Sequence, residues 1–391
     1  MVRVENERKF RWLTLLALAG IIIVVELGFD NFGSDARFLN DYFDRSDYAH
    51  IGARILTGEI PYVDGATEYP QVPVYLFRGL TWLASRIFPV YWPVEAGFLV
   101  VWTFVVSVIT LLVAWQVWRM LPEGKKRFAW LMFLPAAIYF CLNRFDIIPV
   151  YISLLAIMAI RRQRFTPAAI LLAIGALTKW YLALIFPVFL VYELGLTRKL
   201  PWRSVIAFGS ICIAILLPTF ILGGWQAVWQ PYAWHLNRLS EPGTFQWFVG
   251  NALGDGGLGW IDPAAPTTLF TVLGFSGILL VFQKGLNSVN KVVLTSIAVL
   301  LLFIFFTRIF SPQWWLWILP FLILTIDTKL DLILIILYDL LDYAAFPITY
   351  DLTGSESTIH LLVTGSLLIL IVFLFVRTIM KLKRVEVQVP V

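Results

Sequence analysis

The sequence has little charge and few cysteines. Asp, Glu, Lys and Arg make up only 14% of its 391 residues, far below the roughly 25% typical of soluble domains. Its two cysteines, Cys141 and Cys212, are isolated from each other, so they indicate neither a disulfide framework nor a metal site. Internal repeats, low-complexity tracts and basic patches of the kind that bind nucleic acid are also lacking. These absences argue against a soluble domain and against a nucleic-acid partner.

Hydrophobic residues dominate what is present. They make up 60% of the chain, and the mean hydropathy is +0.81. Apolar runs of about 20 residues recur, and helices are the natural interpretation because barrel strands would alternate apolar and polar residues. The sequence therefore predicts an all-α polytopic membrane protein with about 12 transmembrane helices. The expected spans are 12–28, 95–118, 128–141, 145–160, 166–178, 180–195, 203–222, 266–283, 291–306, 311–327, 331–348 and 358–380.

Basic residues predict the orientation of these spans. If the N-terminus is cytoplasmic, most of the 30 Lys and Arg residues fall on the cytoplasmic side, as the positive-inside rule requires. The C-terminus is then cytoplasmic too, and the expected location is the plasma membrane. This topology treats 12–28 as a retained span, with a cleaved signal peptide as the lesser alternative. It also lays the short helix 75–88 on the outer interface and places Lys179 at the outer tip between two short spans.

Two extracytoplasmic loops, 29–94 and 223–265, interrupt what is otherwise a single transmembrane domain over 1–391. The first loop holds most of the acidic residues of the chain's first third. Within it, residues 44–58 predict a short helix with Ser46 as N-cap and Gly58 as its stop. The second loop is rich in tryptophan and is expected to lie on the membrane interface. Polar clusters beside hydrocarbon are candidate functional sites, and in this topology they gather on the outer side.

Several of these outer motifs resemble those of a known family. They are Ser46-Asp-Tyr, Gly58-x-x-Pro-Tyr62, Glu68-Tyr-Pro70, Asn143-x-x-Asp146, Thr178-Lys179, Tyr232-x-x-His235-x-x-Arg238 and Ser311-Pro-Gln-x-x-Leu-Trp317-x-x-Pro320. Together they are similar to polytopic C-type (GT-C) glycosyltransferases. The similarity is strongest to the polyprenyl-phosphate-mannose-dependent branch, which includes bacterial phosphatidylinositol-mannoside and eukaryotic glycosylphosphatidylinositol mannosyltransferases. One departure is that Gln71 follows Tyr69-Pro70, where the family has a second proline.

The resemblance implies a GT-C-like fold and an inverting transfer. A hexose, mannose by preference, would move from a polyprenyl-phosphate donor to a lipid-linked or glycan acceptor, with membrane lipids around both. The catalytic candidates are Asp47, ranked first, then Asp44 and Glu68. Cationic groups at the leaving phosphate would stabilise its developing charge, and the candidates are Lys179, His235, Arg238 and Arg308. The supporting candidates are His50, Asn143, Asp146, Tyr232 and Gln313.

Other interpretations of these residues remain open. Asp47 at the first position of a helix would favour the helix dipole without any catalytic role. No cofactor is expected, although Asp41 and Asp44 could ligate a divalent cation. The pattern leaves Asp339 and Asp342 unexplained. At the level of function, a transporter or flippase of a lipid-linked sugar is the main alternative, and a polysaccharide polymerase or ligase is a third.

Overall fold

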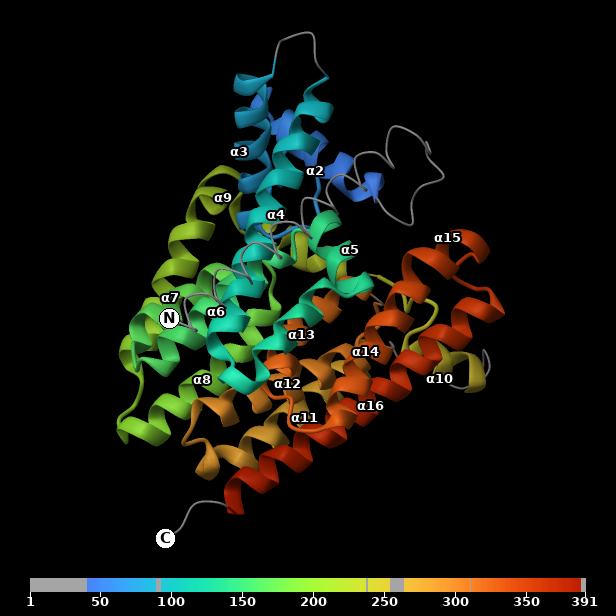
Figure 1. The fold of residues 1–391 in the computed structure, drawn as a ribbon. Coiled ribbons are helices and arrows are strands. Elements are labelled where there is room, and N and C mark those ends of the chain that lie inside the picture. Colours follow the sequence, from blue (N-terminus) through green and yellow to red (C-terminus); the bar gives the residue numbers. More distant parts are fainter. Residues whose placement is uncertain (1–40, 89–92, 237, 254–263, 310, 388–391) are drawn as a thin grey trace, which may run out of the picture.

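The structure is a computed structural model that describes residues 41–88, 93–236, 238–253, 264–309 and 311–387. Over these residues the chain is helical and forms no strand beyond an isolated bridge between Pro61 and Gly65 (Figure 1). The predicted first span, 12–28, lies outside the described residues. The all-helical prediction is confirmed for the part of the chain that is described.

The helices account for most of the described residues. In chain order they are α2 (Tyr42–Leu56), α3 (Gln71–Ile87), α4 (Val94–Met120), the 3₁₀ segment η2 (Glu123–Phe133), α5 (Pro135–Asn143), α6 (Ile147–Arg161), α7 (Phe165–Ala176), α8 (Tyr181–Thr197), α9 (Trp202–Leu236), α10 (Phe245–Leu253), α11 (Ala264–Phe282), η3 (Gln283–Gly285), α12 (Val289–Phe306), η4 (Pro312–Trp314), α13 (Trp315–Leu324), α14 (Lys329–Tyr343), the π-helical segment η5 (Ala344–Thr349), α15 (Tyr350–Thr353) and α16 (Thr358–Val387).

Within the described residues, five stretches of helix are long and apolar enough to cross a membrane. They are Val94–Met120, Trp202–His235, Val289–Phe306, Lys329–Thr353 and Thr358–Arg384. A sixth span results if α5 and α6 count as one, although they meet at 105°. Shorter apolar helices, such as α7 and α8, cover other predicted spans. The protein is therefore embedded in a membrane, while the count of twelve spans stays a prediction.

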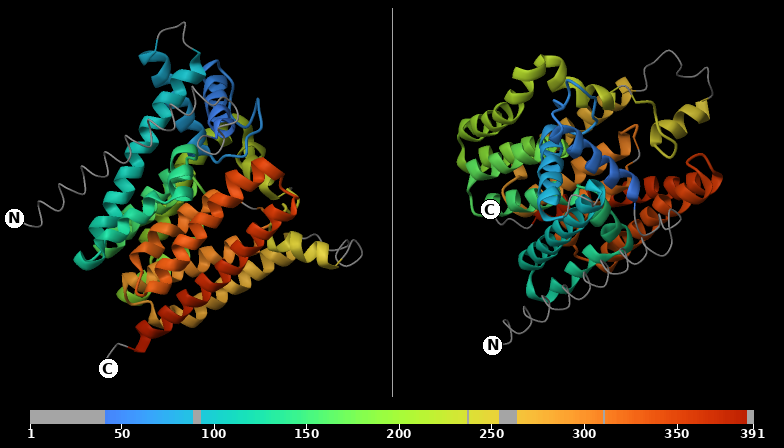
Figure 2. Two further views of the ribbon diagram at one scale, coloured as in Figure 1. Left: turned by 45° about the vertical axis from the view of Figure 1, so that its right-hand side comes forward. Right: turned by 90° about the horizontal axis from the view of Figure 1, so that it is seen from above.

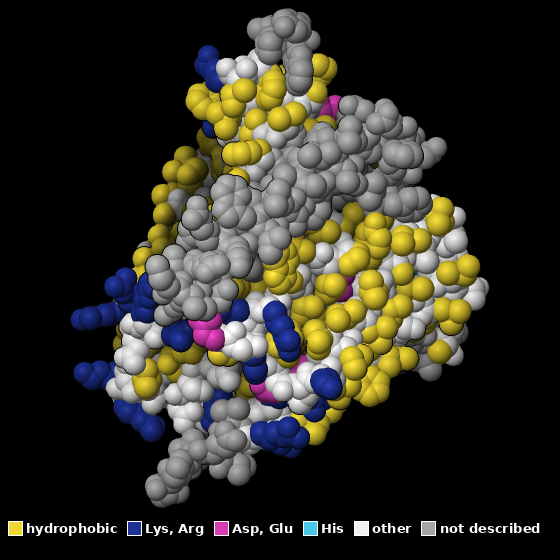
Figure 3. Space-filling model, in the orientation of Figure 1, with side chains coloured by type: hydrophobic (Ala, Val, Ile, Leu, Met, Phe, Trp, Pro, Cys, Tyr) yellow, Lys and Arg dark blue, Asp and Glu magenta, His cyan; other side chains and the backbone are white. Residues whose placement is uncertain are grey.

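The long helices share a general direction, and α2 and α3 lie across one end of the bundle (Figure 1, Figure 2). Lys and Arg side chains gather at the opposite end in the space-filling view, with a broad hydrophobic surface over α14 to α16 (Figure 3). At that basic end, Arg377 and Lys381 of α16 form ion pairs with Asp331 of α14 at 3.1 and 3.0 Å. Thr328 and Asp331 form a capping box at the start of α14. We call the end that carries α2 and α3 the acidic end.

The predicted helix 44–58 begins earlier than expected. α2 starts at Tyr42 with Asp41 as its N-cap residue, so the prediction that Ser46 is the N-cap is wrong. The Asp41 backbone amide donates to Asn143 Oδ1 at 3.0 Å, and this distant contact holds the extra turn. The predicted stop is confirmed, because Gly58 follows the C-cap Thr57 with φ of +108°, a conformation that glycine adopts without a steric penalty.

The second predicted loop, 223–265, is partly helical. α9 continues through it to Leu236 after a break at Gly224, where φ is +68° and ψ is −164°, and α10 covers 245–253. Beside the break, a Cβ on Gly223 would lie 2.5 Å from Val63 Cγ2, so the helix packs closely against the segment that links α2 to α3. The Gln230 side chain then accepts from the Thr67 backbone amide at 3.3 Å. The break thus lets the end of α9 cover the α2–α3 segment.

Asp339, unexplained by the sequence, has a structural role. Its carboxylate accepts from the backbone amides of Ala136 and Ala137 at 2.9 and 3.0 Å, and from Trp315 Nε1 at 2.9 Å. Amides in the first turn of a helix have no partner within that helix, so a side chain of α14 caps α5. Asp342 is fully buried, and neither carboxylate oxygen has a hydrogen-bond partner among the described residues.

Replacing Asp339 with leucine should destabilise the fold. The change leaves the three buried donors without an acceptor, and a buried group left unsatisfied costs about 1–3 kcal/mol. Thermal unfolding of the purified protein in detergent should show a clear fall in the midpoint. Glu356→Gln, at an exposed position of the α15–α16 connection, is the control and should not change it. An unchanged midpoint for Asp339→Leu would show that the caps add no stability.

Candidate active site at the acidic end

Five separate segments bring their polar residues together at the acidic end. The segments are α2, the α2–α3 connection, the α5–α6 junction, the α7–α8 junction, and the residues from the end of α9 to Glu241. Glu241 in turn contacts Arg308, which follows α12. Their side chains form two connected groups. One surrounds the carboxylates of Asp47 and Glu68, and the other surrounds Arg144.

Tyr69 joins the two carboxylates of the first group. Its hydroxyl hydrogen-bonds with the side chains of both Asp47 and Glu68. Burial raises the pKa of Asp47 above its ordinary value of 3.8, and the nearby negative charge of Glu68 raises it further. Burial and the charge of Glu68 also raise the pKa of Tyr69 well above 10, so this hydroxyl keeps its proton. The result is a half-buried carboxylate pair that shares a donor.

The corrected start of α2 changes the interpretation of Asp47. It lies in the second turn, five residues after Tyr42, and not at the first helical position. The helix dipole acts within the first turn, so it does not account for a carboxylate here. Burial instead disfavours the charged form, so Asp47 accepts a proton more readily than an exposed aspartate does.

Cationic groups border Glu68 on one side. Arg238 lies 3.6 Å from the Glu68 carboxylate and also pairs with Glu241. His235 Nε2 lies 3.1 Å from the Glu68 backbone carbonyl oxygen. Arg308 donates to the His235 carbonyl at 3.2 Å, and the Arg308 carbonyl accepts from the Glu241 amide at 2.8 Å. Three of the predicted phosphate-binding residues therefore meet beside a predicted acid.

Lys179 lies at the turn between α7 and α8, as the sequence predicts. Its ammonium is 3.4 Å from the carboxylate of Asp146 and 4.5 Å from the centre of the Phe145 ring. Asp146, fully buried at the bend between α5 and α6, also accepts from Trp317 Nε1 at 2.7 Å. Among the described residues, Lys179 therefore pairs with a single carboxylate, that of Asp146, which also accepts the hydrogen bond from Trp317.

The second group places Asp41 and Asp44 on Arg144. This buried guanidinium pairs with Asp41 at 2.5 Å and with Asp44, and it lies 5.6 Å from the centre of the Phe346 ring. The Asn143 side chain donates to the Tyr139 carbonyl at 2.9 Å. Asp44 is thus held in an ion pair, which disfavours the alternative in which it acts as the base.

The remaining predicted residues are less closely involved. His50 is exposed and lies 4.0 Å from Glu95, so it pairs there rather than with Asp47. Tyr232 packs against the Trp229 ring at 5.8 Å, and Gln313 is half-buried in η4. Tyr69 and Trp317 belong to the site but are not among the residues predicted from the sequence. Their positions in the motifs Glu68-Tyr-Pro70 and Ser311-Pro-Gln-x-x-Leu-Trp317 were the only indication of a role.

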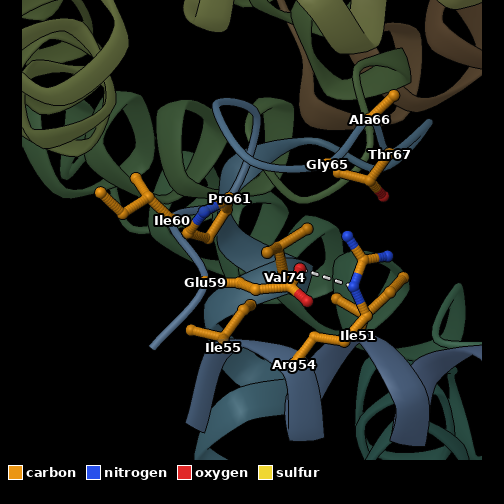
Figure 4. A pocket seen from close by; sticks show the side chains of 10 residues that line it. All are labelled: Ile51, Arg54, Ile55, Glu59, Ile60, Pro61, Gly65, Ala66, Thr67 and Val74. Carbon is orange, nitrogen blue, oxygen red and sulfur yellow. Dashed lines mark hydrogen bonds and ion pairs between the residues drawn. The ribbon is translucent and has the colours of Figure 1, made fainter. Parts of the chain in front are cut away.

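A small surface pocket lies one helical turn from Asp47 along α2 (Figure 4). Ile51 and Ile55 of α2 and Val74 of α3 form its apolar side. Arg54 crosses it to pair with Glu59 at 2.6 Å. The remaining lining residues are Ile60, Pro61, Gly65, Ala66 and Thr67. The pocket has room for little more than a water molecule.

In the described part of the chain, no group of three His, Cys, Asp or Glu side chains is placed to hold a metal ion. The expectation of metal-independent chemistry stays a prediction.

No protein-family model matches the chain, and no curated protein matches it. Any functional conclusion therefore rests on the geometry of this site and on the sequence motifs that assemble it.

Asp47→Asn should stabilise the protein at neutral pH. A carboxyl whose pKa is higher in the folded state than in the unfolded state destabilises the fold at pH values above the folded-state pKa. This destabilisation decreases as the pH falls through the folded-state pKa toward the unfolded-state pKa. The variant should therefore unfold at a higher temperature than wild type at pH 7, with a difference that shrinks toward pH 4.

The matched variant is Asp44→Asn, which breaks the ion pair with Arg144 and should lower the unfolding temperature. Equal effects of the two substitutions would contradict the assignment of a raised pKa to Asp47.

Proposed function

We propose that the protein is a membrane glycosyltransferase related to the GT-C superfamily. It transfers a hexose, mannose by preference, from a polyprenyl-phosphate donor to a lipid-linked or glycan acceptor. The observation that carries this proposal is the meeting of a carboxylate pair, Asp47 and Glu68, with Arg238, His235 and Arg308. Glycosyl transfer requires a base that deprotonates the acceptor hydroxyl and cations that stabilise the leaving phosphate. The candidate site contains groups of both kinds.

Each group has a defined role in an inverting transfer. The Asp47 carboxylate takes the proton of an acceptor hydroxyl while that oxygen attacks the anomeric carbon. The bond to the phosphate oxygen breaks, and polyprenyl phosphate leaves with the bonding electrons. Lys179, Arg238 and Arg308 stabilise the charge that develops on the phosphate. A monophosphate leaving group needs less neutralisation than a diphosphate, so these cations suffice in principle without a metal.

The proposed location is the plasma membrane, with the acidic end on the extracytoplasmic side. The basic end, which Figure 3 shows opposite α2 and α3, then lies in the cytoplasm with the C-terminus of α16. This orientation agrees with the positive-inside rule. The polyprenyl tail of the donor stays in the bilayer, so the donor reaches the site laterally from the membrane.

The decisive test is transfer by purified protein in detergent. Wild type with a radiolabelled polyprenyl-phosphate mannose and total membrane lipid should give a labelled product. Asp47→Asn should lower kcat by about 10²- to 10⁴-fold, the usual contribution of a general base. Asp64→Asn is the matched control. Within the described parts of the chain, the Asp64 side chain accepts one hydrogen bond, from the backbone amide of Ile60 at 2.7 Å, so this variant should keep its activity. Full activity in Asp47→Asn would remove Asp47 as the base.

The pH profile gives an independent test of the carboxylate pair. Asp47 must be deprotonated to act as a base, so kcat/KM should fall on the acid side as Asp47 takes up its proton. Glu68→Gln removes the second-largest cause of the raised Asp47 pKa. The acid limb of the variant should therefore move to lower pH. A limb that stays in place would show that Glu68 does not set the protonation of Asp47.

A transporter or flippase of a lipid-linked sugar is the second candidate. The 105° bend between α5 and α6 favours it, because Asp146 lies at this bend and transporters form midplane sites from broken helices. The detergent assay separates the two functions, because a transporter moves its substrate without forming a glycosidic bond and so gives no labelled product. Absence of any product from folded wild-type protein would favour the transporter.

A further inference from the structure

The side chain of Gln71 is a buried polar group without a partner. It is 0% exposed, and neither Nε2 nor Oε1 has a hydrogen-bond partner among the described residues. Buried amides in native proteins are nearly always satisfied, and an exception calls for an explanation. An inward-facing amide that binds nothing destabilises the fold, so its retention points to a partner that comes from outside the chain.

Gln71 lies in the chain between two residues that contact the site. It is the first residue of α3, and because side chains lean toward the N-terminus of their helix, its amide lies at the end of α3 that faces the site. Tyr69, two residues before it, bridges the carboxylate pair. The next residue, Val72, donates its backbone amide to the Leu177 carbonyl at 3.2 Å, two residues before Lys179. Gln71 thus joins the acidic and cationic sides.

The surface pocket reaches α3 one turn beyond Gln71. Val74, three residues further on and hence on a neighbouring part of the helix face, lines the surface pocket beside α2. That pocket also lies one turn from Asp47.

The chemistry of the amide selects its partner. Nε2 donates and Oε1 accepts, and both are unsatisfied. A phosphate has only acceptors at its non-bridging oxygens and would leave Oε1 without a donor. A hydroxyl both donates and accepts, so adjacent hydroxyls of a sugar ring satisfy both atoms at once. The phosphate already has cations around it in Lys179, Arg238 and Arg308.

We infer that Gln71 binds hydroxyl groups of the transferred hexose and so takes part in selecting the sugar. This inference rests on the proposed glycosyl transfer and adds the residue that recognises the sugar. It also gives a role to the amide that stands in place of the family's second proline.

The test combines Gln71→Met with donors that lack single hydroxyls. Methionine keeps the length of the side chain and removes its polar atoms. The variant without donor should unfold at the same or a higher temperature than wild type, because an unsatisfied amide has been removed. With the complete sugar, kcat/KM should fall by about 10- to 100-fold, the effect of one or two lost hydrogen bonds. One deoxy donor should be poor for wild type and no worse than the complete donor for Gln71→Met.

Thr295→Val is the control for removal of an unsatisfied group elsewhere. Thr295 is fully buried in α12 and its hydroxyl has no described partner. It lies eleven residues before Phe306, the last residue of α12, roughly 16 Å along the helix from the end that precedes Arg308. This variant should keep wild-type activity and wild-type discrimination among the deoxy donors.

Each outcome decides the inference. A lower unfolding temperature for Gln71→Met would show that the fold itself satisfies the amide, and it would overturn the inference. Unchanged kcat/KM, or unchanged discrimination among donors, would show that a buried water or nothing occupies the amide, and would overturn it too. If wild type transfers no sugar at all, the proposed function fails, a result distinct from loss of the Gln71 effect in an active enzyme.

Discussion

The structure depends on one constraint: polar groups beside hydrocarbon must find partners within the protein. At the acidic end this constraint produces continuous pairing. Arg144 holds Asp41 and Asp44, Asp146 holds Lys179, and Glu68 meets Arg238. Because the partners come from distant segments, satisfying the charges also fixes the positions of α2, the α5–α6 bend and the α7–α8 turn. The same contacts that allow charge near the bilayer thus assemble the candidate site.

Pairing is not uniform over this end, and the differences separate structural from functional groups. The carboxylates of Asp44 and Asp339 have strong partners and hold helices in place. Asp47 is half-buried with a raised pKa, and the Gln71 amide has no partner among the described residues. Groups of the second kind weaken the fold, and proteins commonly keep such groups where activity needs them. They are the groups from which our proposals are built.

Much of this arrangement follows from sequence, and some of it does not. Apolar runs predict the long helices, Gly58 marks the end of α2, and the short spans around Lys179 place it at a turn. The start of α2 at Tyr42 was missed because it depends on Asn143, 102 residues away. The cap that Asp339 gives to α5 is likewise a contact between helices 202 residues apart in sequence. Local helix propensity carries no information about such contacts. These contacts determine which carboxylates have structural partners and which remain available to act as a base.

The central claim is that one outward-facing site binds a lipid phosphate and a sugar together. Cryo-electron microscopy of the protein with a polyprenyl-phosphonate hexose, which cannot transfer its sugar, tests it most directly. The account predicts the phosphonate beside Lys179, Arg238 and Arg308, with the sugar between Asp47 and Gln71. Density for the headgroup at the basic end, beside Arg377 and Lys381, would contradict it.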